Sequence, residues 1–134
     1  MTLSCLCGQS RVEIARRPDF IHECNCTLCG KTGAQWAYFH PSEVSVAGAT
    51  RGYSRQDKDD PSADIRFCET CGVTTHFTLT ASAIAQFGNG MMGVNMRLAD
   101  ESELAGLELR YPDGRAWSGS GEFGYVREAR VIGD

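Results

Sequence analysis

The sequence lacks a long apolar stretch. Its longest uninterrupted apolar run extends from Trp36 to Phe39, whereas a helix that crosses a membrane needs roughly 20 such residues. The N-terminal residues lead directly into Cys5, without the basic and then apolar segments of a secretory signal. We therefore expect a cytoplasmic protein with no membrane partner.

Clusters of basic residues are also scarce. Arg16 and Arg17 are adjacent, but no larger basic cluster occurs, and the formal net charge is -4. Proteins that bind nucleic acid usually concentrate positive charge on one surface to neutralise phosphates. We therefore expect no nucleic acid partner.

Cysteine is too infrequent for a fold built on disulfide bonds. Seven of the 134 residues are cysteine, which is below the ~8–10% typical of disulfide scaffolds, and the number is odd. The reducing conditions of the cytoplasm disfavour disulfides further. The thiols therefore need another explanation.

The cysteines are clustered, as metal ligands usually are. They form two close pairs and one close triple: Cys5 and Cys7, Cys68 and Cys71, and Cys24, Cys26 and Cys29. In each C-x-x-C motif, two intervening residues allow one tight turn to direct both sulfurs at one ion, and a glycine follows. The alternative, seven unrelated thiols that pack as small apolar side chains, does not account for this clustering.

Seven cysteines cannot complete two four-ligand zinc sites, so we expect one site with four ligands and one with three. In one division, the two C-x-x-C motifs share an ion, which leaves Cys5, Cys7 and Cys24 as the incomplete set. In the other division, the first and last pairs share an ion, which leaves the triple on a single loop. The spacing alone leaves both divisions open.

The abundance of glycine, with 15 residues, and the rarity of periodic apolar segments favour a mainly β fold with tight turns. We expect one domain over residues 1–134. Short helical turns are expected at 41–43 and 100–104. Strands are expected at residues 2–7, 11–15, 20–24, 35–40, 44–46, 74–79 and 92–96.

Two segments are expected to lie at the surface. Residues 51–64 are polar and charged, which predicts an exposed loop. The sequence Tyr111-Pro112-Asp113-Gly114 predicts a turn, because proline fixes φ and glycine relaxes it. Residues 111–134 are expected to form a peripheral C-terminal strand or tail, with the strand at 117–125.

The motifs together resemble one protein family. They occur in this order: Cys5-x-Cys7-Gly8, Cys24-x-Cys26-x-x-Cys29, and Phe67-Cys68-x-x-Cys71-Gly72. Over roughly residues 3–97, this arrangement resembles the glutathione-dependent formaldehyde-activating enzyme family, which also includes centromere protein V. The resemblance implies a β-tent fold of short antiparallel sheets, a structural zinc on the first and last pairs, and a second zinc on the triple.

The family is assigned to carbon-sulfur lyases that interconvert formaldehyde and glutathione with S-(hydroxymethyl)glutathione. The resemblance therefore implies a small thiol and a small aldehyde as substrates, with the reactive zinc on Cys24, Cys26 and Cys29. A zinc ion with three thiolates and an open fourth position can bind an incoming thiol as thiolate or polarise an aldehyde oxygen. Because three thiolates outweigh the charge of the ion, thiol capture is favoured.

One further residue is a candidate for the site. His76 lies five residues after Cys71 and is a candidate proton shuttle or occasional fourth ligand at the open zinc. The alternative is that it is a hydrogen-bonded strand histidine. The sequence shows no cationic pocket for the two carboxylates of glutathione, although Lys31 and Arg66 are near the ligands in sequence.

Two functions follow from these observations. The first is a zinc-dependent carbon-sulfur lyase-like enzyme that acts on a thiol such as glutathione and an aldehyde such as formaldehyde. The second is a non-catalytic zinc-binding β-tent module for protein interaction or metal buffering, in which the triple binds zinc weakly or not at all. Thiol-dependent turnover that disappears in a folded Cys26→Ser variant distinguishes the first from the second.

Overall fold

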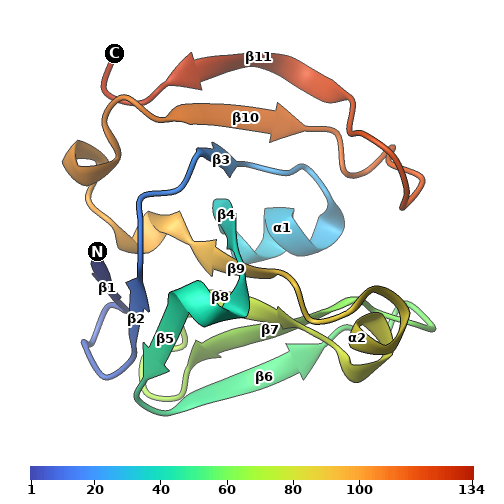
Figure 1. The fold of residues 1–134 in the computed structure, drawn as a ribbon, viewed down its shortest axis with the longest axis horizontal. Helices are drawn as coiled ribbons and strands as arrows, with labels where there is room; N and C mark the ends of the chain where they lie inside the picture. Colours follow the sequence, from blue (N-terminus) through green and yellow to red (C-terminus); the bar gives the residue numbers. More distant parts are fainter.

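Alternating burial in the first strands builds a three-stranded sheet. In β2 (Arg11–Ile14), Val12 and Ile14 are buried, and the two charged residues are exposed. β2 pairs antiparallel with β1 (Thr2–Ser4) and with β5 (Val44–Ala47). Figure 1 shows this sheet beside the N-terminus, at the left of the molecule.

A larger sheet of eight strands extends through the rest of the molecule. The computed structural model describes residues 1–134, and the strand order is β11-β10-β3-β4-β9-β8-β7-β6. All neighbours are antiparallel except β3 and β10, which pair in parallel. The strands are β3 (Phe20–His22), β4 (Trp36–Phe39), β6 (Thr50–Ser54), β7 (Ala63–Cys68), β8 (Thr74–Leu79), β9 (Met92–Asn95), β10 (Glu108–Pro112) and β11 (Tyr125–Val131).

Short helices connect the strands, and none is both long and apolar enough to cross a membrane. α1 begins after Cys26, whose Sγ accepts a hydrogen bond from the backbone N–H of Cys29, and ends at Gly33 with φ of 69°. Its six residues are too few for an apolar period, so the sequence analysis did not predict it. The helices are α1 (Thr27–Thr32), α2 (Ala81–Phe87), and the 3-10 turns η1 (Pro41–Glu43), η2 (Met96–Leu98) and η3 (Glu101–Leu104).

The buried apolar side chains form two clusters. The larger cluster lies between the two sheets and includes Val12, Ile21 and Val94. The smaller one contains Ala34, Trp36, Ile65 and Phe77 and packs against Leu28 and Cys29. The smaller cluster therefore supports the loop that carries the cysteine triple.

The mainly β prediction is confirmed, but the surface segments differ from what was expected. The prediction of a loop over 51–64 is wrong at both ends, because β6 extends to Ser54 and β7 begins at Ala63. β6 is an edge strand with no buried residue, so it lacks the apolar alternation that identifies a strand. The C-terminal strand, β11, begins at Tyr125, later than expected, and it is also an edge strand.

Candidate metal centres and active site

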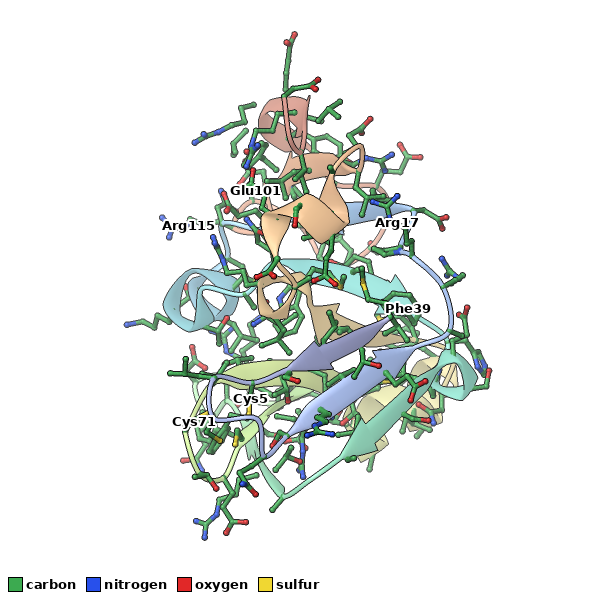
Figure 2. The ribbon with its side chains drawn as sticks, turned by 90° about the vertical axis from the view of Figure 1, so that its left-hand side faces the viewer. Cys5, Arg17, Phe39, Cys71, Glu101 and Arg115 are labelled. Atoms are coloured by element: carbon green, nitrogen blue, oxygen red, sulfur yellow. The ribbon has the colours of Figure 1, made fainter.

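Four cysteines meet where the first hairpin approaches the turn between β7 and β8. Cys5 and Cys7 follow β1, Cys68 ends β7, and Cys71 lies in the turn. Their Sγ atoms all lie within 4.8 Å of one another. Figure 2 shows Cys5 beside Cys71, although the two belong to distant parts of the sequence. Gly72 has φ of 76°, the conformation for which glycine is favoured.

The distances between these sulfurs suit a tetrahedral zinc ion. The Sγ of Cys7 lies 3.6 Å from that of Cys5 and 3.7 Å from that of Cys68. Tetrahedral ligands with a Zn–S bond of ~2.3 Å are roughly 3.8 Å apart. The backbone N–H of Ser10 donates to Cys5 Sγ at 3.3 Å, and all seven cysteines are free thiols. The residues present therefore fit a zinc site with four thiolates.

The cysteine triple lies on the connection from β3 to α1, and its Sγ atoms are also within 4.8 Å of one another. The backbone N–H of Cys26 donates to Cys24 Sγ at 3.4 Å, and that of Cys29 donates to Cys26 Sγ at 3.3 Å. Hydrogen bonds from Cys24 and Cys29 lower the pKa of the Cys26 thiol to about 2, because they stabilise its thiolate.

The sulfur atoms of the seven cysteines are grouped four and three. This is the second of the two divisions left open by the spacing, in which the first and last pairs form one group and the triple forms the other.

The segment after β10 holds the triple in place. Asn25 Nδ2 donates to Asp113 Oδ1 at 2.8 Å, and the backbone N–H of Arg115 donates to Asn25 Oδ1 at 2.9 Å. Between them, Gly114 packs so closely on Cys24 that a side chain there would overlap its sulfur. The prediction of a turn over 111–114 is wrong at its start, because Tyr111 and Pro112 belong to β10 and the turn begins at Gly114. No pattern in the sequence predicted the contact of this turn with the triple.

The triple opens onto a pocket of about 280 Å³. Trp36, Tyr38 and Phe77 line it from β4 and β8, and Trp117 and Phe123 line it from the segment between β10 and β11. The first three rings pack edge to face, with centroids 4.9 Å apart for Trp36 and Phe77. These five rings form the aromatic lining of a pocket whose other residues include the three cysteines and the charged side chains of Arg55, Lys58 and Asp60.

Tyr38 carries the polar group of this aromatic lining. Its hydroxyl lies 3.0 Å from Nδ1 of His22, which is buried, and His22 Nε2 has no hydrogen-bond partner. Burial, followed by the charge of Arg110, lowers the pKa of His22 to about 4. Burial also raises the pKa of Tyr38, and the neighbouring cysteine thiolates add to this effect. Both side chains are therefore neutral near pH 7.

The cations at the pocket come from the loop between β6 and β7. Arg55 and Lys58 line the pocket, and Arg55 donates two hydrogen bonds to Asp57, at 2.7 and 2.6 Å. Lys31 and Arg66 are near the cysteines in sequence, but neither of them lines this pocket. This loop contains both acidic and basic residues, so the sequence does not indicate which of its basic residues line the pocket.

His76 belongs to neither cysteine group and does not line the pocket. It is buried in β8, its Nδ1 lies 2.8 Å from the Thr75 hydroxyl, and it pairs with Arg66 on β7. The next residue, Phe77, lines the pocket, so alternation directs His76 to the other face of the sheet. This placement favours the alternative of a hydrogen-bonded strand histidine.

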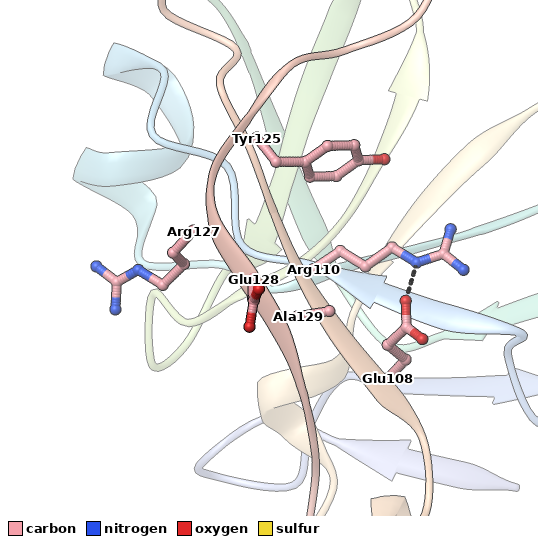
Figure 3. A pocket seen from close by; sticks show the side chains of 6 residues that line it. All are labelled: Glu108, Arg110, Tyr125, Arg127, Glu128 and Ala129. Atoms are coloured by element: carbon pink, nitrogen blue, oxygen red, sulfur yellow. Dashed lines mark hydrogen bonds and ion pairs between the residues drawn. The ribbon is translucent and has the colours of Figure 1, made fainter.

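A second hollow, of about 490 Å³, lies along β10 and β11. Figure 3 shows the six residues that line it, including Glu108 and Arg110, which are joined by a hydrogen bond of 2.6 Å. No cysteine or histidine lines this hollow. The pocket at the triple, which contains three thiols that could bind a metal ion, is therefore the candidate active site.

Comparisons with known proteins identify the family that this chain resembles. The family model described as "Glutathione-dependent formaldehyde-activating enzyme" matches residues 1–106, a range that contains both cysteine groups. A crystal structure of a Rhodobacter sphaeroides protein is similar, with 27% sequence identity and a TM-score of 0.58, and the match covers 75% of this chain and 88% of that chain. Comparison with curated proteins gives no match. Trp117 and Phe123 lie beyond the family match.

Proposed function

Because this chain belongs to the glutathione-dependent formaldehyde-activating enzyme family, we propose that it is a zinc-dependent carbon-sulfur lyase-like enzyme that acts on a thiol and a small aldehyde. The observation that carries this proposal is the pocket. It is lined by all three cysteines of the triple and by none of the four-cysteine group. The four-cysteine group then has a structural role, and the triple has the reactive one.

The reaction needs no oxidant or reductant. In the direction of synthesis, the thiol sulfur bonds to the aldehyde carbon, the carbonyl π bond breaks, and the proton lost by the thiol ends on the carbonyl oxygen. Cleavage of the adduct is the reverse. When bound at Cys24, Cys26 and Cys29, zinc would supply a site that favours the thiolate form of the incoming thiol.

We assign to Tyr38 the role of donating a hydrogen bond to the carbonyl oxygen of the aldehyde. A buried N–H without a partner is rarer and costlier than a buried acceptor without one. Since Nε2 of His22 has no partner, the favoured tautomer carries its proton on Nδ1 and donates to the Tyr38 oxygen. The Tyr38 O–H is then free to donate into the pocket and to stabilise charge that develops on the oxygen.

The enzyme hypothesis is tested by the rate of adduct exchange. Zinc-loaded protein is added to formaldehyde and glutathione, and exchange NMR measures the rate of interconversion above the uncatalysed rate. Cys26→Ser is expected to remove the acceleration while circular dichroism shows a folded protein. No acceleration by folded, zinc-loaded wild type with any thiol would favour the non-catalytic module.

The role of Tyr38 is tested against a second tyrosine. Tyr38→Phe is expected to lower kcat by on the order of 10² without changing the zinc content or the affinity for the thiol. Tyr53→Phe is the matched control, because Tyr53 is 52% exposed and does not line the pocket. Equal loss in both variants would contradict the assignment.

A further inference from the structure

The segment of residues 113–124, between β10 and β11, fixes two aromatic side chains beside the triple. The hydrogen bonds of Asn25 to Asp113 and Arg115 join this segment to the cysteine loop. The whole segment lies beyond the end of the family match at residue 106. It therefore adds a part of the pocket that the matched region does not supply.

The two rings of this segment present an apolar surface. The centroids of Trp117 and Phe123 are 4.5 Å apart, and Phe123 also meets His22 edge to face at 5.8 Å. The indole N–H of Trp117 donates to the carbonyl oxygen of Gly121 at 3.2 Å. Since the polar atom of Trp117 is paired within its own segment, the part of the ring that lines the pocket is apolar.

The charges at the pocket do not match those of glutathione. Glutathione has two carboxylates and one ammonium group. Of the two cations that line the pocket, Arg55 is bound to Asp57 by two hydrogen bonds, which leaves Lys58 without a carboxylate partner. Asp60 also lines the pocket and accepts a hydrogen bond from Gln86 at 3.1 Å. One free cation can pair with one carboxylate, not with two.

Formaldehyde is too small to account for the aromatic lining. A molecule with one carbon fills only a small part of the pocket, whose volume is about 280 Å³. Most of the ring surface of Trp36, Phe77, Trp117 and Phe123 would then have no contact with the substrate. A flat apolar group of one ring matches this lining in chemistry and size, because aromatic rings pack favourably on one another. The sulfur of such a molecule could reach the triple while its ring lies among these side chains.

We propose that the thiol substrate of this site carries a flat apolar group, such as an aryl ring, which is bound by the aromatic lining that Trp117 and Phe123 complete. This inference rests on the proposed function, because it assigns the thiol of that reaction. Trp117 and Phe123 are specificity-determining residues in this account. They bind the body of the thiol and take no part in the bond that forms at its sulfur.

The test compares thiols by binding, without turnover. Calorimetry on the zinc-loaded full chain measures Kd for 2-phenylethanethiol, 2-mercaptoethanol and glutathione. We expect 2-phenylethanethiol to bind at least tenfold more tightly than 2-mercaptoethanol, because its ring is removed from water, and glutathione to bind no more tightly than 2-mercaptoethanol. Equal binding of the first two, or tighter binding of glutathione, overturns the proposal.

Variants identify the residues responsible. Trp117→Ala and Phe123→Ala are each expected to reduce the preference for 2-phenylethanethiol severalfold and to leave the Kd of 2-mercaptoethanol unchanged. Phe87→Ala is the matched control, because Phe87 is 75% exposed and does not line the pocket. A preference that survives both variants overturns the assignment of Trp117 and Phe123, and the wild-type comparison stands if a variant fails to fold.

The outcomes separate this inference from the proposed function. A preference for 2-phenylethanethiol without adduct exchange for any pair of substrates would overturn the lyase reaction alone. Acceleration of adduct exchange with glutathione and no preference for 2-phenylethanethiol would overturn the assignment of the thiol alone.

Discussion

Individual cysteines differ in how much of the fold depends on them. Cys68 is fully buried, and its sulfur is 3.7 Å from that of Cys7, so it joins the end of β7 to the first hairpin. Cys26 lies on a loop and is partly exposed. A ligand in the four-cysteine group should therefore matter for folding, and a ligand in the triple should matter for chemistry.

Cys68→Ser is expected to abolish the cooperative thermal unfolding transition. A structural zinc site supplies folding free energy comparable to the whole stability of a domain, and serine does not replace a thiolate ligand. The measurement is a melting curve by circular dichroism, with Cys26→Ser as the matched control that keeps its transition. A normal melting curve for Cys68→Ser would contradict the structural role of this group.

His76 and His22 both have a lowered pKa, so a variant is needed to isolate the pH dependence that comes from His76. Burial, followed by the charge of Arg66, lowers its pKa in the folded protein to about 4 from 6.5, and Asp64 opposes this shift. Between these values the unfolded chain binds the proton and the folded chain does not, so the free energy of unfolding falls as the pH falls from 6.5 to 4.

His76→Gln removes this titration and keeps a side chain that can bond to Thr75. The decrease in unfolding free energy between pH 6.5 and pH 4 is expected to be smaller in the variant by roughly 1–3 kcal/mol. Urea unfolding at several pH values measures this decrease in both proteins. Taking the difference between variant and wild type cancels the contribution of the cysteines. The same pH dependence in both proteins would show that His76 is not buried in its neutral form.

At the scale of elements, close packing of β8 on β9 shapes the floor of the pocket. Gly93 of β9 lies opposite Phe77 of β8 in the sheet, and a side chain at Gly93 would overlap the Phe77 ring. Phe77 in turn packs edge to face on Trp36. Because Gly93 has no side chain, the Phe77 ring can lie against β9 and pack on Trp36 in the aromatic lining.

Two glycine substitutions are expected to act in opposite directions. Gly93→Ala should lower the free energy of unfolding by about 1–3 kcal/mol, because the Phe77 ring has to move. Gly30→Ala in α1 meets no atom within 4 Å and should raise it by about 0.5–1 kcal/mol, because alanine favours the helix. Urea unfolding measures both changes, and a neutral Gly93→Ala would contradict the close packing of β8 on β9.

At the scale of the whole molecule, each cysteine group joins segments that are distant in sequence. The four-cysteine group joins the first hairpin to the turn between β7 and β8, and the triple is held by the segment that follows β10. The two groups share no ligand, so each should load and lose its ion independently.

The metal content tests this independence. Purified wild type is expected to contain two zinc ions per chain, and the variant with Cys24, Cys26 and Cys29 all changed to serine is expected to contain one and to remain folded. Atomic emission gives the metal content, and circular dichroism reports the fold. One ion in both proteins would mean that the triple does not hold zinc, which would favour the non-catalytic module.

The sequence by itself determined the features that depend on local spacing. Two residues between cysteines predict a shared ion, alternation in Arg11–Ile14 predicts a half-buried strand, and glycine content favours a β fold. The order of the cysteine motifs also carried the resemblance to the family. Each of these signals lies within a few residues, so they can be read without knowing which segments meet.

Tertiary structure alone decided which distant groups share a site. It selected between two divisions of the cysteines, directed His76 away from the pocket, and brought Tyr38, Arg55 and Trp117 to the triple. Single polar or aromatic residues on edge strands and loops have no periodic pattern, because their role comes from contacts across the sheet. The spacing of the seven thiols predicts metal ligands from the sequence, but the walls of the pocket exist only once β4, β7, β8 and the segment after β10 pack together.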